Sequence, residues 1–330
     1  MSRHRSGGRW PNASFATGTI VTAESNAAAA PYVGRFAPSP TGPLHFGSLL
    51  AAVASFLQAR SNDGRWLLRI EDIDPPREKA GADRLIVHAL ERYGFEWDGD
   101  IRYQSNSAAL HRDAISRLRD SGYAYECGCS RRDLADVPRG PLGPIYPGTC
   151  RNGSSATEFA IRVRTDNQPV CFDDLLQGRQ CQRLESESGD FVIHRRDGLV
   201  AYHLAVVADD ADQSVSEIVR GIDLMDSTPR QIHLQRLLGL PTPAYMHVPV
   251  AVNAAGQKLS KLTGAPAVPA DDPRPTLVVA LRALRLPADD ELRACRLDDI
   301  WQWAMARWQP AALAGVSAIP LGPDSPLSRT

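Results

Sequence analysis

The segment from Tyr32 to Arg60 constrains the fold most, because it joins a short strand to a helix through a turn rich in proline and glycine. Tyr32 to Ala37 is typical of a strand, and Phe46 to Arg60 carries the apolar spacing of a helix. His45 and Gly47 then lie at the helix start. Free N–H groups and the positive end of the helix dipole can bind a phosphate there. Taken alone, the segment also fits an ordinary α/β loop.

A second segment with phosphate-binding character lies far downstream, at Gln257 to Lys261. It follows an apolar stretch, Met246 to Val252, which we predict as one strand, and a turn, Asn253 to Gly256. Its two lysines are mobile point charges that can follow charge as it moves during phosphoryl chemistry. An isolated Lys-x-x-Lys also fits a solvated basic loop. Together with the first segment it indicates a nucleotide site.

These two segments resemble the two ATP-binding signatures of class I aminoacyl-tRNA synthetases, and their detail resembles the glutamyl and glutaminyl branch. Three further segments fit in the family's order: Arg69–Asp74, Tyr202–Ala205 and Arg220–Leu224. The resemblance covers roughly Val33 to Pro266 and implies a Rossmann-type nucleotide-binding fold. It assigns ATP binding to Pro38, His45, Gly47, Ser48, Lys258, Ser260 and Lys261.

The amino-acid pocket can be argued from charge. Glutamate brings two carboxylates and one ammonium, so a selective pocket needs cations for the first and an anion for the second. Arg35 and Arg220 offer planar, permanently charged forks, Glu71 can bind the ammonium, and the Tyr202 hydroxyl can donate to a carboxylate. The resemblance assigns glutamate contacts to these residues, with Ser39 near the same site. Glu71 also fits an ordinary acidic residue after a strand, but ligands of open parallel sheets bind at strand C-termini.

The implied chemistry needs positioning and charge stabilisation more than covalent help. The α-carboxylate of glutamate attacks the α-phosphate of ATP, pyrophosphate leaves and glutamyl-adenylate forms. Charge builds on the phosphate oxygens, and we expect His45 and Lys261 to stabilise it, with Lys258 in support. Magnesium would accompany ATP, held mostly by phosphates and water. An RNA hydroxyl then attacks the mixed anhydride.

The acceptor is inferred from family and length. The chain ends at Thr330, which leaves little room after Lys261 for the anticodon-binding region of discriminating glutamyl-tRNA synthetases. Such a core resembles the glutamyl-queuosine tRNA(Asp) synthetases, which activate glutamate without tRNA and attach it to the queuosine base of tRNA(Asp). Val206 stands where discriminating enzymes typically carry Asn, so contacts in the pocket are expected to differ.

Three interpretations stay open. The favoured one is this tRNA-modifying ligase. The second is a truncated synthetase that charges tRNA(Glu), or a glutamate-activating core with a non-RNA acceptor. The third is a non-catalytic paralogue that binds RNA or zinc. The intact charged residues of the pocket argue against this third interpretation.

The cysteine spacing predicts a metal site. Cys127 and Cys129 are too close for an ordinary disulfide, and Cys150 adds a third thiolate, which suits four-coordinate zinc. Tyr146 is a candidate fourth ligand through its phenolate. The spacing alone also fits three reduced thiols. In the resembled family a Cys-x-Cys…Tyr-x-x-x-Cys zinc site lies in the insertion between the halves of the nucleotide fold, and the match is position by position. The other cysteines lack metal spacing and are interpreted as incidental: Cys171, Cys181 and Cys295.

Composition favours a globular enzyme. Hydrophobic residues make up 43% and charged residues 23%, which is enough for a sizeable core. No apolar run is long enough to span a bilayer, and the N-terminus lacks the apolar region of a secretory signal. The net charge of −1 is not the basic balance frequent in nucleic-acid binders, so RNA contacts must be local. We expect a cytoplasmic monomer with no membrane partner.

The pattern of strands and helices predicts five segments. Residues 1–30 are expected to form a disordered extension, and 31–122 the first half of the doubly wound fold. Residues 123–190 are expected to insert a zinc-binding subdomain, 191–270 to complete the catalytic fold, and 271–330 to form a helical region with a frayed tail and no anticodon-binding domain. The later secondary structure is predicted as a strand at Phe159–Arg164 and helices at Thr228–Leu238, Leu277–Leu284 and Glu291–Trp308.

Overall fold

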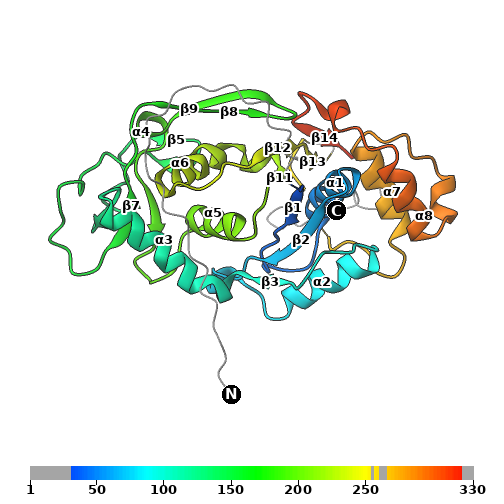
Figure 1. The fold of residues 1–330 in the computed structure, drawn as a ribbon, viewed down its shortest axis with the longest axis horizontal. Coiled ribbons are helices and arrows are strands. Elements are labelled where there is room, and N and C mark those ends of the chain that lie inside the picture. Colours follow the sequence, from blue (N-terminus) through cyan, green and yellow to red (C-terminus); the bar gives the residue numbers. More distant parts are fainter. Residues whose placement is uncertain (1–30, 254–255, 260–265, 322–330) are drawn as a thin grey trace, which may run out of the picture. The chain divides into compact units, whose positions relative to one another are not determined.

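The computed structural model describes residues 31–253, 256–259 and 266–321, and it confirms the strand and helix predicted at the first signature (Figure 1). Strand β1 is Val33–Phe36 and helix α1 is Phe46–Ser61. Every β1 residue is buried, and α1 packs against β1. The turn between them therefore leads from the C-terminal end of a buried strand to a helix N-terminus.

Parallel strands form the centre of the structure, as predicted for an α/β fold. They are β2 (Arg65–Ile70), β3 (Arg102–Tyr103), β11 (Glu217–Gly221) and β12 (Ala244–Val248). β2 lies between β1 and β3, and β11 pairs with β12, all in parallel. The Ser216 N–H donates to the Val33 carbonyl oxygen at 2.9 Å, which joins β1 to the β11 side. The two halves of the fold thus meet edge to edge.

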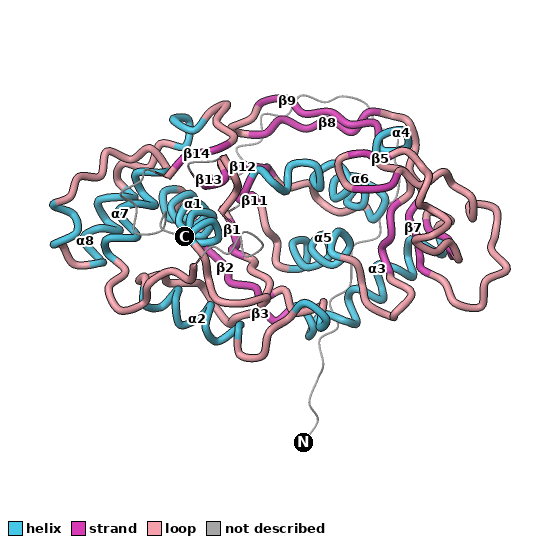
Figure 2. Tube along the Cα trace, turned by 180° about the vertical axis from the view of Figure 1, so that it is seen from behind, coloured by secondary structure: helices cyan, strands magenta, loops and turns pink. Residues whose placement is uncertain are grey.

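Helices from both halves of the chain pack around these strands. They are α2 (Ala82–Arg92), α3 (Ala108–Asp120), α5 (Tyr202–Asp212), α6 (Thr228–Leu238), α7 (Arg274–Ala283) and α8 (Leu297–Met305). α7 and α8 lie beside α1, while α3, α5 and α6 contact one another (Figures 1 and 2). The helix predicted at Thr228–Leu238 is confirmed. The helix predicted over Glu291–Trp308 is broken, because a 3₁₀ turn, Glu291–Ala294, precedes α8.

An aromatic cluster joins α8 to the first half of the fold. The Trp301 ring lies 4.8 Å from Phe56 and 5.0 Å from Phe95, measured between centroids, and Phe56 meets Trp66 edge-on at 5.1 Å. The Trp301 indole N–H also donates to the Tyr93 carbonyl oxygen at 2.9 Å. Truncating a buried aromatic residue costs about 3–5 kcal/mol, so this cluster is a major attachment of the C-terminal helices.

The region predicted as an insertion contributes to two sheets. Its strands are β4 (Ala124–Cys127), β5 (Arg139–Gly140), β6 (Gly143–Pro144), β7 (Ala160–Val163), β8 (Pro169–Asp174) and β9 (Gly178–Arg183), with a short helix α4 (Leu184–Glu187). β4 and β7 form an antiparallel sheet with β10 (Phe191–His194). The β8–β9 hairpin instead extends the β11–β12 sheet, through the pair Asp174 and Tyr245. The hairpin therefore places Asp174 beside the parallel strand β12.

Two predictions need correction. Met246–Val252 is not one strand, because β12 ends at Val248 and β13 (Val250–Val252) pairs with β14 (Ala318–Pro320) in another sheet. Pro249 separates them, since proline has no N–H for a sheet ladder. The interpretation of Cys171 and Cys181 as incidental is also wrong, since they are direct partners across β8 and β9 and form a disulfide.

No helix in the described part of the chain combines the length and the apolarity that crossing a membrane requires.

Candidate active site

A cavity of about 500 Å³ lies at the C-terminal ends of the parallel strands, where α1 and α5 begin. This is the edge at which open parallel sheets bind ligands, and the volume suits small-molecule substrates. Every predicted glutamate- or ATP-binding residue that the structure describes lines it: Arg35, Pro38, Ser39, His45, Gly47, Ser48, Glu71, Tyr202, Arg220 and Lys258. Ser260 and Lys261 lie outside the described residues.

The start of α1 is built by the first signature. His45 is the N-cap residue, with an extended backbone (φ −109°, ψ 167°). Its Nδ1 accepts the Ser48 N–H at 3.3 Å, and its Nε2 lies 3.0 Å from the Ser48 hydroxyl. Nδ1 is thus the acceptor of the neutral ring, so Nε2 carries the proton and donates to Ser48. The imidazole is held at the helix terminus, facing the cavity that it lines.

The two segments predicted to bind ATP lie against each other. A Cβ atom on Gly47 would stand 2.9 Å from the Leu259 carbonyl oxygen and 3.3 Å from the His45 ring. Such an approach to a backbone oxygen is too close for any side chain. Glycine is therefore required for the downstream loop to close on the start of α1.

Lys258 pairs with Asp223, which lies in the 3₁₀ turn Ile222–Ser227 that follows β11. Its ammonium lies 2.6 Å from the Asp223 carboxylate, and both side chains are about 40% exposed. Half-exposed pairs contribute little to stability. A bound polyphosphate would therefore compete with Asp223 for this lysine at low cost.

A buried cluster of charges reaches the cavity through Arg35 and Glu71. Asp210 of α5 accepts a hydrogen bond from Arg35 Nε at 3.1 Å and lies 2.8 Å from Arg69 Nη1. Arg69 Nη2 in turn lies 3.4 Å from Glu71 Oε1. All four side chains are buried. Asp210 therefore links the arginine predicted to bind a carboxylate with the acid predicted to bind the ammonium.

The two carboxyls of the cluster differ in acidity. Burial alone would raise the pKa of Asp210, but Arg35 and Arg69 hold it below its usual value. Burial also raises the pKa of Glu71, and the same two arginines offset only part of that rise. Asp210 is thus the carboxyl of the cluster that is ionised without a ligand. A cation placed next to Glu71 would favour the ionised form of Glu71.

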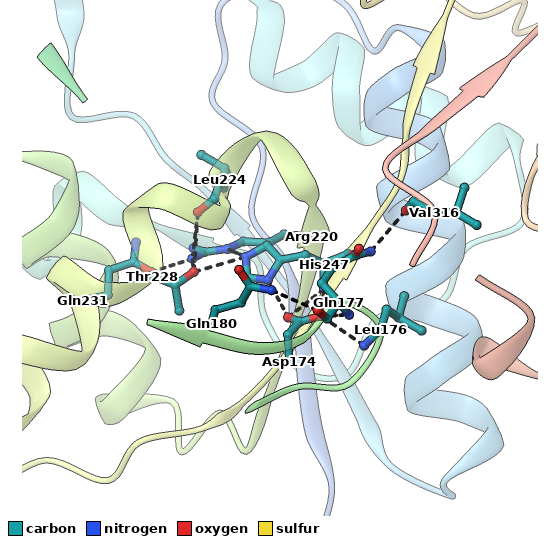
Figure 3. A network of polar contacts seen from close by, with 10 residues as sticks. All are labelled: Asp174, Leu176, Gln177, Gln180, Arg220, Leu224, Thr228, Gln231, His247 and Val316. Carbon is teal, nitrogen blue, oxygen red and sulfur yellow. Dashed lines mark hydrogen bonds and ion pairs between the residues drawn. The ribbon is translucent and has the colours of Figure 1, made fainter. Parts of the chain in front are cut away.

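Arg220 and Tyr202 supply hydrogen-bond donors to the cavity. Arg220 is buried at the end of β11, and its Nη1 has no hydrogen-bond partner in the described part of the chain, although the rest of its fork is bonded (Figure 3). Burial raises the pKa of Tyr202, so its hydroxyl stays protonated and can donate. A ligand carboxylate is an acceptor that both groups can use.

The predicted metal ligands also come together. The Sγ atoms of Cys127, Cys129 and Cys150 all lie within 4.8 Å of one another. The Tyr146 hydroxyl lies 3.4 Å from Cys127 Sγ and 3.5 Å from Cys129 Sγ, and Cys129 and Cys150 Sγ are 3.6 Å apart. We call these four residues the Cys–Tyr cluster. Zinc–sulfur bonds of about 2.3 Å place tetrahedral sulfurs about 3.8 Å apart, so the cluster fits an ion of this size.

Neighbouring residues shape the Cys–Tyr cluster. A Cβ atom on Gly128 would stand 2.4 Å from Ala156 Cβ, so the residue between the first two cysteines must be glycine. Arg162 Nε donates to Cys127 Sγ at 3.2 Å, and its guanidinium lies over the Tyr146 ring at 3.9 Å. A cation beside the cluster offsets the negative charge of several thiolates.

Sequence reasoning missed the residues that hold the cavity's charged groups. Asp210 belongs to a stretch of α5 that is otherwise apolar, and two adjacent acids in such a stretch are a signal that could have found it. His247 and Asp174 gave no such signal, because only sheet pairing brings His247 to Arg220 and Asp174 to His247. Val206 is buried and does not line the cavity, so it makes no contact there.

Comparison with known proteins identifies the family. Residues 32–302 match the model of "tRNA synthetases class I (E and Q), catalytic domain". Relatives named "Glutamyl-Q tRNA(Asp) synthetase" include one from Aromatoleum aromaticum, 52% identical over 284 residues, covering 85% of this chain and 90% of the relative. Another, from Pseudomonas aeruginosa, is 50% identical over 290 residues, covering 88% and 97%.

Solved structures agree on the fold. A glutamate-tRNA synthetase from Elizabethkingia anophelis superposes with a TM-score of 0.77 at 20% identity, over 90% of this chain and 69% of that one. The predicted class of fold, the nucleotide-binding α/β fold of class I synthetases, is thereby confirmed. The chain belongs to the class I tRNA synthetases of the E and Q type, and within them to the family of the glutamyl-Q tRNA(Asp) synthetases.

Proposed function

We propose that the protein activates L-glutamate with ATP and transfers the glutamate to the queuosine base in the anticodon loop of tRNA(Asp). The observation that carries the proposal is that two sets of groups line one cavity. The first set, arginines and a carboxyl, suits glutamate, and the second, the start of helix α1, suits phosphate. The names of relatives about half identical to this chain support queuosine-bearing tRNA(Asp) as the acceptor.

In this proposal the charge cluster and Arg220 bind glutamate. Arg35, Arg220 and the Tyr202 hydroxyl donate to the carboxylates, and Glu71 binds the ammonium. The ammonium also opposes the effect of burial on the pKa of Glu71, because it favours the ionised carboxyl. Ser39, exposed at the cavity rim, lies near the same site.

The start of α1 and the downstream loop bind ATP. His45, Ser48 and the N-terminal end of helix α1 face the phosphates, while Pro38 and Gly47 leave room for the nucleotide. Lys258 exchanges Asp223 for a phosphate, and Ser260 and Lys261 are proposed to act from the same loop. Mg²⁺ bound with ATP would neutralise phosphate charge, and phosphate oxygens and water would supply most of its ligands.

The first chemical step is an in-line displacement. A glutamate α-carboxylate oxygen forms a bond to the α-phosphorus of ATP, and the bond to the bridging oxygen breaks, so that pyrophosphate leaves with the electron pair. His45, Lys258 and Lys261 stabilise the negative charge on the phosphate oxygens. Because Arg35 and Arg220 fix the amino acid, the reaction depends on proximity rather than on a covalent enzyme intermediate.

The second step transfers the glutamyl group. A hydroxyl of the queuosine ring attacks the carbonyl carbon of the adenylate, its proton is released, and AMP leaves. The mixed anhydride is already activated, so no dedicated general base is assigned. The cytoplasmic location, the monomeric state and the limits of the inserted subdomain, 123–190, stay predictions.

We propose zinc for the Cys–Tyr cluster. Cys127, Cys129, Cys150 and Tyr146 give it four ligands, which closes the coordination shell, as in structural zinc sites. The ion would fix the loop between Cys129 and Tyr146 against β4 and take no part in the reaction.

The test is glutamate transfer with labelled glutamate and ATP. The acceptors are tRNA(Asp) with queuosine, the same tRNA without it, and tRNA(Glu). We expect label on the queuosine-bearing tRNA(Asp) alone. Label on tRNA(Glu) would identify a minimal charging synthetase. Exchange of pyrophosphate into ATP without transfer would indicate another acceptor, and silence in both assays would favour a non-catalytic paralogue.

A further inference from the structure

A buried chain of hydrogen bonds runs from Asp174 through His247 to Arg220 (Figure 3). Arg220 and His247 are direct partners across the parallel strands β11 and β12, so their side chains leave the same face of the sheet. Asp174 ends β8, which borders β12. The exposed fractions are 4% for Asp174, 0% for His247 and 5% for Arg220.

Asp174 is an anion held by several donors. Its Oδ1 accepts the N–H groups of Leu176 and Gln177 at 3.0 Å each, and its Oδ2 accepts the His247 backbone N–H at 3.1 Å. Burial alone would raise the pKa of Asp174, but His247 and these backbone donors hold it below its usual value. The carboxylate is therefore ionised and fixed in orientation.

This anion determines which nitrogen of His247 carries the proton. His247 Nδ1 lies 2.6 Å from Asp174 Oδ2, and Nε2 lies 3.1 Å from Arg220 Nε. Because arginine can only donate, Nε2 must accept, and the proton belongs on Nδ1, where Asp174 accepts it. Burial and the charge of Arg220 lower the pKa of His247 against the opposing effect of Asp174, which keeps the ring neutral.

Of the two terminal nitrogens of the Arg220 guanidinium, only Nη2 forms hydrogen bonds in the described part of the chain. Nη2 donates to the Thr228 hydroxyl and to Gln231 Oε1, each at 2.8 Å. Nη1 is buried and has no partner in the described part of the chain, and Arg220 lines the cavity. Two of its three nitrogens are thus fixed by the protein, and the third is left for a ligand.

We propose that Asp174 and His247 are positioning residues for glutamate binding, which hold the Arg220 fork so that Nη1 meets a substrate carboxylate. This inference rests on the proposed function, in which Arg220 binds glutamate. Without an acceptor at His247 Nε2, the Arg220 Nε–H would be buried without a partner, and the fork would turn to satisfy it. Nη1 would then leave the position that the carboxylate needs.

The first variant is Asp174→Asn, which keeps size and removes the charge. The amide oxygen keeps more bonds when it faces Leu176 and Gln177, so the amide NH₂ faces His247 Nδ1. Nδ1 then becomes the acceptor, and the proton moves to Nε2, where it opposes Arg220. We expect ¹⁵N spectra of histidine-labelled protein to show Nδ1–H in the wild type and Nε2–H in the variant.

The second test separates the two nitrogens of His247. His247→Gln can place an oxygen where Nε2 lies and accept from Arg220, whereas His247→Asn can reach Asp174 but not Arg220. We measure glutamate-dependent ATP–pyrophosphate exchange and expect the glutamate KM to rise about 10- to 100-fold for the Asn variant, as for loss of one charge-assisted hydrogen bond. The Gln variant should stay near the wild type. Because Arg220 is proposed to bind glutamate and not the phosphates of ATP, the ATP KM should change less than about twofold in both His247 variants.

Matched controls are His88→Asn and His88→Gln, at an exposed position of α2. Equal glutamate KM values for the two His247 variants, or glutamate and ATP KM values that rise together, would mean a merely structural role and overturn the inference. An unchanged tautomer in a folded Asp174→Asn protein would overturn it as well. If that protein does not fold, the His247 pair decides. Absence of exchange in the wild type would instead overturn the proposed function.

Discussion

Asp210 is a single carboxylate that serves two buried arginines, and Asp210→Asn tests how much the charge cluster depends on it. The amide oxygen can still accept the two short bonds, from Arg35 Nε at 3.1 Å and from Arg69 Nη1, which lies at 2.8 Å. The substitution therefore removes mainly the charge. Removing one partner of a buried ion pair typically costs about 3–5 kcal/mol. We expect about 3 kcal/mol, the lower end, because the hydrogen bonds survive.

Glu71 should respond to the same change. In the wild type, the charge of Asp210 is one of the causes that raise the pKa of Glu71. Without that charge, Glu71 ionises more readily and draws Arg69 toward itself, since the two already lie 3.4 Å apart. Arg35 loses the carboxylate with which it forms an ion pair, at 3.1 Å, and keeps only the weaker attraction of Glu71. We therefore expect the glutamate KM to rise about tenfold, while the ATP KM changes little.

Urea unfolding and glutamate-dependent pyrophosphate exchange measure the two effects. The matched control is Asp212→Asn on the same helix, where Asp212 pairs with Arg102 at 2.6 Å but is 42% exposed. That pair should contribute at most about 1 kcal/mol. If Asp210→Asn lowers the free energy of unfolding no more than the control does, the cluster does not depend on Asp210, and the reasoning from buried charge is wrong.

Three other predictions concern the loop, pH and metal. Gly47→Ala should raise the ATP KM at least about tenfold in the exchange assay, because its Cβ atom meets the Leu259 carbonyl oxygen; an unchanged KM would show that the loop yields freely. Burial lowers the pKa of His203 to about 3 and also lowers that of His247, so both rings bind protons less readily in the folded protein than in the unfolded chain, which protonates them below about pH 6.5. Stability is therefore lost as pH falls below 6.5, by about 1 kcal/mol at pH 5.5 from His203 alone, and equal urea midpoints at pH 7.5 and 5.5 would contradict this. A chelator should release about one zinc ion per chain and lower the thermal midpoint, equally in a Cys295→Ser control; a metal-free wild type would remove the basis for zinc in the Cys–Tyr cluster.

The parts of the fold that could be predicted have local causes. The turn that leads into α1 is determined by neighbouring residues, since prolines and glycines separate an extended segment from a helical one. The predicted bounds of helix α6, Thr228–Leu238, match the structure because a proline follows its first residue and Gly239 ends it in a left-handed conformation (φ +65°). Signals of this kind do not depend on the rest of the chain.

The parts that could not be predicted depend on partners distant in sequence. Cys171 and Cys181 are partners through the register of a hairpin, which their spacing does not reveal. The stretch Met246–Val252 is apolar over most of its length, and only the pairing of its second part with β14 shows that it serves two sheets. Periodicity reports which residues are buried but not which strand lies beside them.

The same distinction explains which site residues were found. Those that face the cavity stand in short motifs, whereas those that hold them lie on other elements. Arg35 of β1 is held by Asp210 of α5, and Arg220 of β11 by His247 of β12. An arginine held in this way loses less side-chain entropy when a carboxylate binds, so a larger share of the free energy of the contact contributes to affinity. Substitutions of the holding residues should therefore act mainly on the glutamate KM, whereas loss of an arginine removes the contact itself.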